Sequence, residues 1–189
     1  MITPNDFKSG QLIKYRDSIW EVISYQRIKN AQRRAFVRAK LRDIFSGAAL
    51  EENFDSWVNL DQPDVERRRS QFLYADADAN AFNFMDMETY EQFTFSAEVL
   101  ADRRYYLTEN LEMFILYLDD KPVTVEIPTF VTLKVTETSP DYAGDTATGG
   151  GKPATLQTGL KVNVPFFIAE GELIRIDTRD NSYVERVTK

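Results

Sequence analysis

Residues 35–44 read AFVRAKLRDI and alternate apolar with basic side chains through their centre. Because successive side chains of a β-strand point to opposite faces, this period of two predicts a strand with one face on an apolar core. The other face is then a continuous row of cations, called here the basic stripe. The apolar positions are Val37, Ala39 and Leu41, and the basic stripe consists of Arg38, Lys40 and Arg42.

The preceding residues 19–28, IWEVISYQRI, have the same strand character, and the polar residues 29–34 join the two stretches. This pattern predicts a β-hairpin with an exposed tip. Seven basic residues and no acid lie between Arg27 and Arg42. An arginine-rich hairpin suits structured RNA, because guanidinium groups bind phosphates in a bidentate way and stack on bases. A solvated, charged hairpin without a partner is the alternative that the residues leave open.

Charge is distributed unevenly along the 189 residues, of which 23 are basic and 30 acidic, for a net charge of −7. Residues 1–64 carry a net +1, residues 65–129 a net −7 and residues 130–189 a net −1. A basic patch on an acidic body favours a polyanion that is contacted at one end only, because the body repels it elsewhere.

The chain has no cysteine and no histidine. It therefore forms no disulfide and lacks thiolate nucleophiles, Ser-His-Asp catalysis and the usual zinc ligands. The longest apolar run, residues 113–118, has six residues, against about 20 in a membrane-spanning helix. We therefore expect a cytoplasmic protein that is not an enzyme, with no catalytic residue, no cofactor and no bound metal.

One stretch resembles a metal loop and is rejected on its spacing. Asp76, Asp78 and Asn80 begin like an EF-hand, but Ala81 and Met87 stand where that loop needs glycine and glutamate, so a hairpin turn is expected. No spacing singles out a carboxylate pair of the kind that glycosidases use. Solvated acids are the better interpretation of the acidic composition.

Strand patterns dominate the rest of the chain. They cover residues 50–54, 71–74, 82–85, 89–95, 113–118, 123–127, 131–135, 161–168, 172–178 and 182–187. One short helix is expected at residues 97–106, with acids early and bases late as the helix dipole prefers. The polar residues 59–70 indicate a boundary. These patterns predict a mainly β chain of three small β-barrel domains, 1–64, 65–129 and 130–189, of which the last two could share an architecture.

Residues 152–171, KPATLQTGLKVNVPFFIAEG, resemble the signature of the bacterial elongation factor P family. The matching positions are Lys152, Ala154, Gly159, Val162, Val164, Pro165, Ile168 and Gly171. Residues 5–15, 72–92, 144–156 and 182–187 are also similar to that family, so the resemblance covers essentially the whole chain.

The resemblance implies an L-shaped, tRNA-like molecule with an N-terminal SH3-like KOW barrel followed by two OB-fold barrels. Family members are translation factors that bind both ribosomal subunits between the P and E sites. They position the P-site peptidyl-tRNA and stimulate peptide-bond formation at stalls such as polyproline stretches. Contact with mRNA at the E site, no contact with DNA or membrane, and a monomeric state are expected on the same ground.

The hairpin tip departs from the family pattern. The family commonly reads Lys-Pro-Gly-Lys-Gly before Ala-Phe and extends this loop to the CCA end of the peptidyl-tRNA. The loop here consists of Lys29, Asn30, Ala31, Gln32, Arg33 and Arg34. Gln32 replaces the tip lysine that many members modify, so either Arg33 takes its place or the factor works unmodified with Arg33 and Arg34 supplying charge. A paralogue that binds RNA or ribosomes without relieving polyproline stalls is the alternative.

Two further sets of residues match family positions in the last domain. Gly144, Asp145 and Thr146 match a loop expected near the E-site codon, and Tyr183 and Arg186 match a pair expected to face RNA. Without the resemblance, the first set would be interpreted as turn residues. The second set would be a core aromatic residue and a surface charge.

Overall fold

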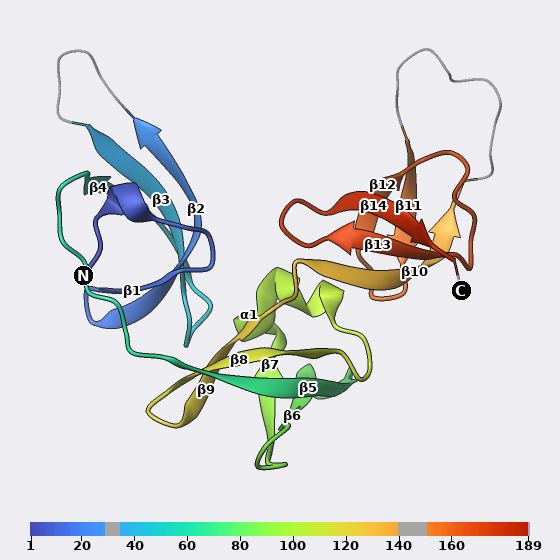
Figure 1. Ribbon diagram of the computed structural model, residues 1–189, viewed down its shortest axis with the longest axis horizontal. Helices are drawn as coiled ribbons and strands as arrows, with labels where there is room; N and C mark the ends of the chain where they lie inside the picture. The colour runs from blue at the N-terminus through green and yellow to red at the C-terminus, as the bar shows by residue number, and fades with distance from the viewer. Residues whose placement is uncertain (29–34, 140–150, 189) are drawn as a thin grey trace.

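The computed structural model describes residues 1–28, 35–139 and 151–188. These residues form three antiparallel β-sheets that follow one another along the chain (Figure 1). The three sheets with their connections are called the first, second and third units. This architecture confirms the predicted, mainly β fold class.

The first unit is a four-stranded sheet preceded by a short 3-10 helix, η1 (Pro4–Asp6). Its strands pair in chain order: β1 (Leu12–Tyr15), β2 (Ser18–Ile28), β3 (Phe36–Asp43) and β4 (Ala49–Asp55). The sequence pattern missed β1, which is only four residues long.

The alternation predicted for residues 35–44 is confirmed in β3. Val37, Ala39 and Leu41 are fully buried in the core of the first unit. Arg38 and Lys40, between them, are exposed. The burial of this apolar set fixes the register of β3, because a slip by one residue would place the arginine and lysine in the core.

The second unit contains five strands and the helices of the chain's middle part. Its strands pair in the order β7-β6-β5-β8-β9. They are β5 (Glu66–Asp76), β6 (Ala81–Asp86), β7 (Gln92–Ser96), β8 (Glu112–Leu118) and β9 (Lys121–Glu126). The segment 59–70, expected as a polar boundary, is strand from Glu66 onward, so that part of the prediction was wrong.

The arginines of this segment belong to the strand because their charges are compensated across the sheet. Arg67 donates to Glu126 at 2.8 and 2.9 Å, and its guanidinium lies 4.3 Å from the ring centre of Phe114. Arg69 pairs with Glu112 in the same way. Cross-strand ion pairs and cation–π contacts of this kind stabilise a polar sheet face, which a count of charges along the chain does not reveal.

The single helix expected at residues 97–106 is instead two short helices in succession. These are α1 (Ala97–Leu100) and the 3-10 helix η2 (Ala101–Tyr106). Ala101 has φ +47°, in the left-handed region, which ends the α-helix there. Residues 97–106 are called the helical segment below.

The third unit repeats the sheet of the second. Its strands are β10 (Phe130–Thr138), β11 (Lys152–Leu156), β12 (Lys161–Val164), β13 (Leu173–Asp177) and β14 (Ser182–Val187). They pair in the order β12-β11-β10-β13-β14. Counted along the chain, the first to fifth strands of the third unit thus take the same places in the sheet as the first to fifth strands of the second unit. The expectation that these two units share an architecture is thus confirmed.

Two predicted strands were too long. The strand expected at residues 89–95 begins at Gln92, because Asp86 accepts hydrogen bonds from the backbone N–H groups of Glu88 and Thr89 and holds a turn there. The strand expected at 161–168 ends at Val164. Pro165 follows and has no N–H for a strand ladder, and its carbonyl accepts from the N–H of Ile168 in a turn.

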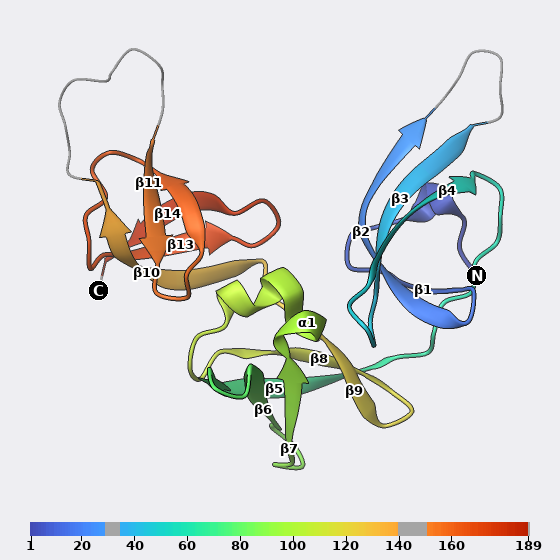
Figure 2. The ribbon, with the colours of Figure 1, turned by 180° about the vertical axis from the view of Figure 1, so that it is seen from behind.

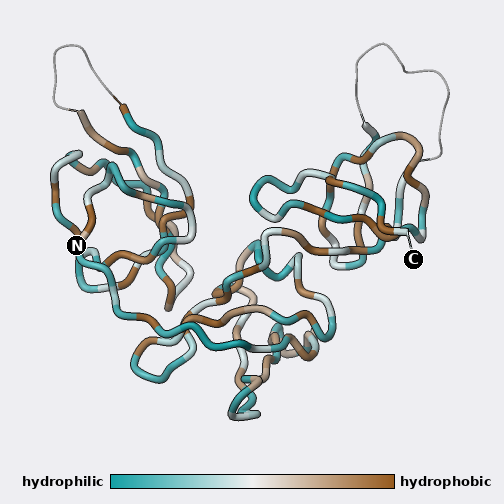
Figure 3. The backbone as a smooth tube through the Cα atoms, in the orientation of Figure 1, coloured by the Kyte–Doolittle hydropathy of each residue, from teal (hydrophilic) through white to brown (hydrophobic). Residues whose placement is uncertain are grey.

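The three units form a bent molecule in which the second unit lies between the other two (Figures 1 and 2). The N-terminus lies on the first unit and the C-terminus on the third. Hydrophobic and hydrophilic residues are intermixed along all three units (Figure 3). In the described part of the chain, no helix is both long and apolar enough to cross a membrane.

Gly47, in the turn between β3 and β4, lies against the helical segment. It has φ +73°, and a Cβ atom there would come within 2.7 Å of the carbonyl oxygen of Glu98. A side chain at this position would therefore be strained by its backbone conformation and would also push the first unit away from the second.

Replacing Gly47 by alanine is expected to destabilise the first unit by about 2–3 kcal/mol, from backbone strain and steric overlap together. Both tryptophans, Trp20 and Trp57, lie in this unit, so urea unfolding followed by tryptophan fluorescence reports on it. Gly171→Ala is the control, since Gly171 has φ +87° with nothing near its missing Cβ. The free energy of unfolding of each variant is measured on the unit that carries the substitution. If both variants lose the same free energy of unfolding, the overlap with Glu98 contributes nothing to the effect of Gly47→Ala.

Asp177 ends β13 and organises the turn that meets the second unit. Its carboxylate accepts hydrogen bonds from the guanidinium and the backbone N–H of Arg179. The Arg179 side chain is the main cause that lowers the pKa of Asp177 to about 2. The same turn carries Asn181, whose amide oxygen accepts a hydrogen bond of 2.5 Å from Tyr106 of the helical segment.

The low pKa of Asp177 predicts an acid-sensitive third unit. A carboxyl whose folded pKa lies below its ordinary value of 3.8 contributes stability above that value and loses it as the pH falls towards about 2. Asp177→Asn should lower the melting temperature at pH 7 and reduce its further fall between pH 4 and pH 2. Thermal unfolding by circular dichroism measures this, with the exposed Asp17→Asn as control; the same pH profile for both variants would contradict the assignment.

Candidate nucleic-acid interface

The hairpin of β2 and β3 extends beyond β1, while β4 accompanies β3 as far as Phe36. The two strands pair from Trp20 with Asp43 to Ile28 with Phe36. On its other side β2 pairs with β1 only as far as Glu21, so its outer half has one neighbouring strand. Figure 1 shows the outer ends of β2 and β3 at one extremity of the first unit. The tip residues Lys29, Asn30, Ala31, Gln32, Arg33 and Arg34 lie outside the described residues.

Two members of the basic stripe, Arg38 and Lys40, share the exposed face of this hairpin. Their cross-strand neighbours on β2 are the neutral Gln26 and Ser24. On β4, the neighbours are Asn53 and an acid, Glu51. The face is therefore cationic along its centre and partly compensated along one edge.

Arg38 contacts that acidic edge directly. Its Nε lies 3.3 Å from Oδ1 of Asn53 and 3.6 Å from Oε1 of Glu51. Both ionic side chains are about half exposed, so the pair is well hydrated and its contribution to stability is small. An incoming phosphate can replace Glu51 as the partner of Arg38. Sequence reasoning overlooked this acid although it lies in a predicted strand, at residues 50–54.

The third member of the basic stripe is placed differently. The Arg42 side chain is only 19% exposed, and its Nη2 lies 4.0 Å from a carboxylate oxygen of Asp102 in the second unit. The structure thus separates Arg42 from the other two stripe residues. Period two predicted its strand face correctly, but the packing of a second unit against the end of that face was not visible in the pattern.

A second cluster of aromatic and basic side chains, the kinds that bind RNA, lies on β14 of the third unit. Tyr183 is partly buried against the core, and Arg186 is exposed. Val184 forms a bulge, so that Tyr183 pairs with Ile176 and Arg186 pairs with Ile174. Tyr183 and Arg186 therefore lie on the same face although they are three residues apart.

Arg186 is held by an acid and an aromatic ring. Its Nη1 donates to Glu172 at 3.0 Å, and its guanidinium lies 5.9 Å from the ring centre of Phe167. The pKa of Glu172 is lowered, chiefly by the hydrogen bond from the backbone N–H of Ala169 and then by Arg186, so this carboxylate stays charged. The arrangement fixes the direction of the arginine.

Phe167 is a candidate binding residue that sequence reasoning missed. Its side chain is largely exposed and lines a hollow with Tyr183 and Phe166. Exposed aromatic rings beside arginine are the side chains on which nucleic-acid bases stack. In the sequence, Phe167 could have been found from the Phe-Phe pair that follows Pro165. That pair was considered only as part of the family signature.

The other expected contacts of the third unit, Gly144, Asp145 and Thr146, lie outside the described residues. Within the described ranges, no group of three or more acidic side chains is arranged to hold a metal ion. The chemistry that the described surface offers is phosphate binding by cations and base stacking on aromatic rings.

Family models match each unit in turn. The elongation factor P KOW-like domain matches residues 3–59, the elongation factor P OB domain matches residues 65–125, and the elongation factor P C-terminal domain matches residues 131–186. The matched ranges follow the three sheets of the fold.

Curated relatives named elongation factor P extend over the full chain. The protein of Pelotomaculum thermopropionicum is 45% identical over 187 residues, which cover 99% of this chain and 100% of the relative. That of Natranaerobius thermophilus is 44% identical and covers 99% and 98%. A solved structure named eukaryotic translation initiation factor 5A, from Methanococcus jannaschii, is 17% identical with a TM-score of 0.46 and covers 66% of this chain and 90% of its own. The chain belongs to the elongation factor P family and is a translation elongation factor.

Proposed function

We propose that this factor binds the ribosome between the P and E sites, positions the peptidyl-tRNA and stimulates peptide-bond formation at stalls such as polyproline stretches. The observation that carries the proposal is the cationic face of the long β2–β3 hairpin, in a chain that matches elongation factor P throughout. A long hairpin at the end of one unit can reach into a narrow site while the other units bind outside it.

The proposed role is positioning, with the ribosome supplying the chemistry. Proline reacts slowly because its amine is secondary and its ring fixes φ, which makes a rigid nascent chain. Holding two reacting groups in the correct geometry can lower a barrier by several kcal/mol. No nucleophile or general base from the factor is needed for such an effect.

The hairpin tip of this chain must position the peptidyl-tRNA without the lysine that many family members carry there. Gln32 offers neutral hydrogen bonds, worth about 0.5–1.5 kcal/mol each, whereas a charged donor contributes about 1.5–3 kcal/mol. We therefore assign the charged contacts with the CCA end to Arg33 and Arg34. Arg38 and Lys40, on the outer half of the same hairpin, supply contacts with backbone phosphates.

The third unit is proposed to contact RNA on the other side of the bend. Tyr183, Arg186 and Phe167 form an aromatic and cationic surface there, and residues 144–146 are proposed to lie near the E-site codon. The factor would thus touch both ribosomal subunits, the P-site tRNA and mRNA, acting in the cytoplasm as a monomer. The three domains are proposed to span residues 1–64, 65–129 and 130–189.

Translation of a polyproline reporter in vitro tests the proposal. Adding the wild-type protein should increase the full-length product, and the double variant Arg33→Ala/Arg34→Ala should lose about tenfold or more of that gain, the equivalent of one charged hydrogen bond. Gln32→Lys should retain activity. A reporter without prolines is the control.

A wild-type protein that leaves the polyproline stall unchanged would contradict the proposed function. If it still sediments with ribosomes, the second candidate function applies, namely a paralogue that binds ribosomes without relieving these stalls. The observation that favours this alternative is Gln32 in place of the tip lysine.

The salt dependence of ribosome binding tests the cationic face. Each phosphate contact contributes roughly −0.7 to −0.9 to the slope of log affinity against log salt concentration. Lys40→Ala should flatten the slope by about this amount. Lys14→Ala is the matched control, because Lys14 is an exposed lysine on β1, a strand that does not belong to the hairpin. Equal slopes for the two variants would assign Lys40 to another role.

A further inference from the structure

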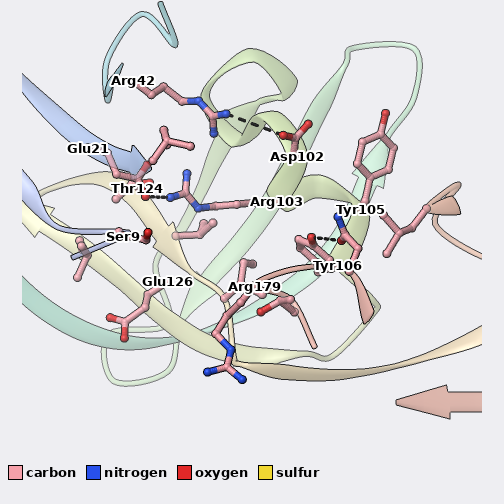
Figure 4. A pocket seen from close by; sticks show the side chains of 18 residues that line it. Ser9, Glu21, Arg42, Asp102, Arg103, Tyr105, Tyr106, Thr124, Glu126 and Arg179 are labelled. Carbon is pink, nitrogen blue, oxygen red and sulfur yellow. Dashed lines mark hydrogen bonds and ion pairs between the residues drawn. The ribbon is translucent and has the colours of Figure 1, made fainter. Parts of the chain in front are cut away.

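Glu21 and Arg103 form an ion pair between the first and second units. Glu21 lies on β2 and is 3% exposed, and the Arg103 side chain, on η2, is 17% exposed. The guanidinium of Arg103 donates directly to Oε1 of Glu21 (Figure 4). A carboxylate removed from water to this degree is stable as an anion only with a partner, so the contact requires both residues.

Two further contacts lie beside this pair and involve the same helical segment. Arg42 approaches Asp102, the residue before Arg103 (Figure 4). Gly47 packs against the carbonyl of Glu98, one turn earlier. Three residues of the first unit therefore meet one short stretch of the second.

The apolar contact between these two units is small. It is a satellite cluster with four buried side chains, of which one belongs to the second unit. The cluster consists of Leu12, Ile19, Ile44 and Val123, with Val65, Leu116 and Leu118 packed against it. A hollow of about 830 Å³ lies next to it and is bordered by residues of all three units. The junction therefore combines this apolar cluster with the polar contacts of Glu21 and Arg42.

The junction between the second and third units is built differently. Tyr106 is buried in the core of the third unit, and Tyr105, Leu111 and Ile127 pack against that core. The hydroxyl of Thr158 donates to the carbonyl of Tyr105 at 2.5 Å. This junction is continuous with a hydrophobic core, so we expect it to keep its geometry when Glu21 or Arg103 is changed.

We propose that Glu21 and Arg103 are positioning residues, whose ion pair fixes the angle of the first unit and thereby the direction of the β2–β3 hairpin. Glu21 lies on the strand that leads to the hairpin tip. Ile28 lies seven residues further along this strand, at a distance of about 23 Å. A rotation of about 10° at the junction would move that end of the strand by about 4 Å, far more than the displacement of about 1 Å that can impair a positioned reaction.

The structural part of this proposal is independent of what the factor does. The consequence for peptide-bond formation rests on the proposed function. The experiment therefore measures the angle and the activity separately.

Distances between spin labels report the angle. The chain has no cysteine, so Asp17→Cys and Ala77→Cys provide one label in the first unit and one in the second. In Glu21→Gln and Arg103→Gln, the distance distribution should broaden or shift by about 2 Å, because Asp17 lies only four residues, or about 13 Å, from Glu21 and moves less than the hairpin end under the same rotation. A second label pair, Ala77→Cys with Ala169→Cys, should keep its wild-type distribution.

Glu52→Gln is the matched control. It removes the same charge from the first unit and breaks the pair of Glu52 with Arg16, which lies within that unit. Arg103→Lys keeps the charge and should retain the wild-type distances. Thermal unfolding shows whether each variant is folded. Because Glu21 and Arg103 lie on opposite sides of the junction, a variant at one of them still tests the pair if the variant at the other does not fold.

In the polyproline reporter assay, Glu21→Gln and Arg103→Gln should be about tenfold less active than Glu52→Gln, an effect of the size that misplacement produces. Wild-type distance distributions in both variants would overturn the proposal that the Glu21–Arg103 pair fixes the angle of the first unit. Changed distances with unchanged activity would overturn the positioning role. If the wild-type protein relieves no stall, the proposed function fails, and the distances alone then decide whether the pair sets the angle.

Discussion

The spatial arrangement of this factor depends on the ten residues of the helical segment, 97–106. Its side chains and backbone meet the first unit at Glu98, Asp102 and Arg103, and they meet the third unit at Tyr105 and Tyr106. Ala101, in the left-handed region, lies between Glu98 and Asp102, so both short helices of the segment contact the first unit. A single short segment thus connects both arms of the bend to the middle unit.

The helical segment is also what distinguishes two otherwise similar sheets. In the second unit it lies between β7 and β8, and in the third unit the corresponding connection, between β12 and β13, is a turn. The same antiparallel architecture therefore serves as a connector in one place and as a terminal unit, proposed to face RNA, in the other. The difference comes from the connection rather than from the strands, as is usual where function resides in loops on a common scaffold.

Local patterns in the sequence predicted the features that burial imposes along one strand. The alternation from Val37 to Leu41 was confirmed in β3 because a sheet packed on one side permits only one register. Features that depend on a neighbouring strand or unit were not predicted. Glu51 beside the basic stripe, the bulge at Val184 and the enclosure of Arg42 each arise from contacts with residues distant in sequence. The alternation of apolar and polar residues along one strand carries no information about those contacts.

Charge pairing explains why one hairpin can direct RNA contact in an acidic protein. The arginines of β5 are compensated across the second unit's sheet, as Arg67 is by Glu126 and Arg68 by Glu66 and Asp120. They add little to the field outside, and the unit's excess acids repel a phosphate backbone. Under the proposed function, RNA is drawn to the first unit, and attraction alone leaves its orientation open. The proposed ion pair of Glu21 and Arg103 would supply that orientation, so that electrostatic attraction and mechanical positioning are separate properties of the same hairpin.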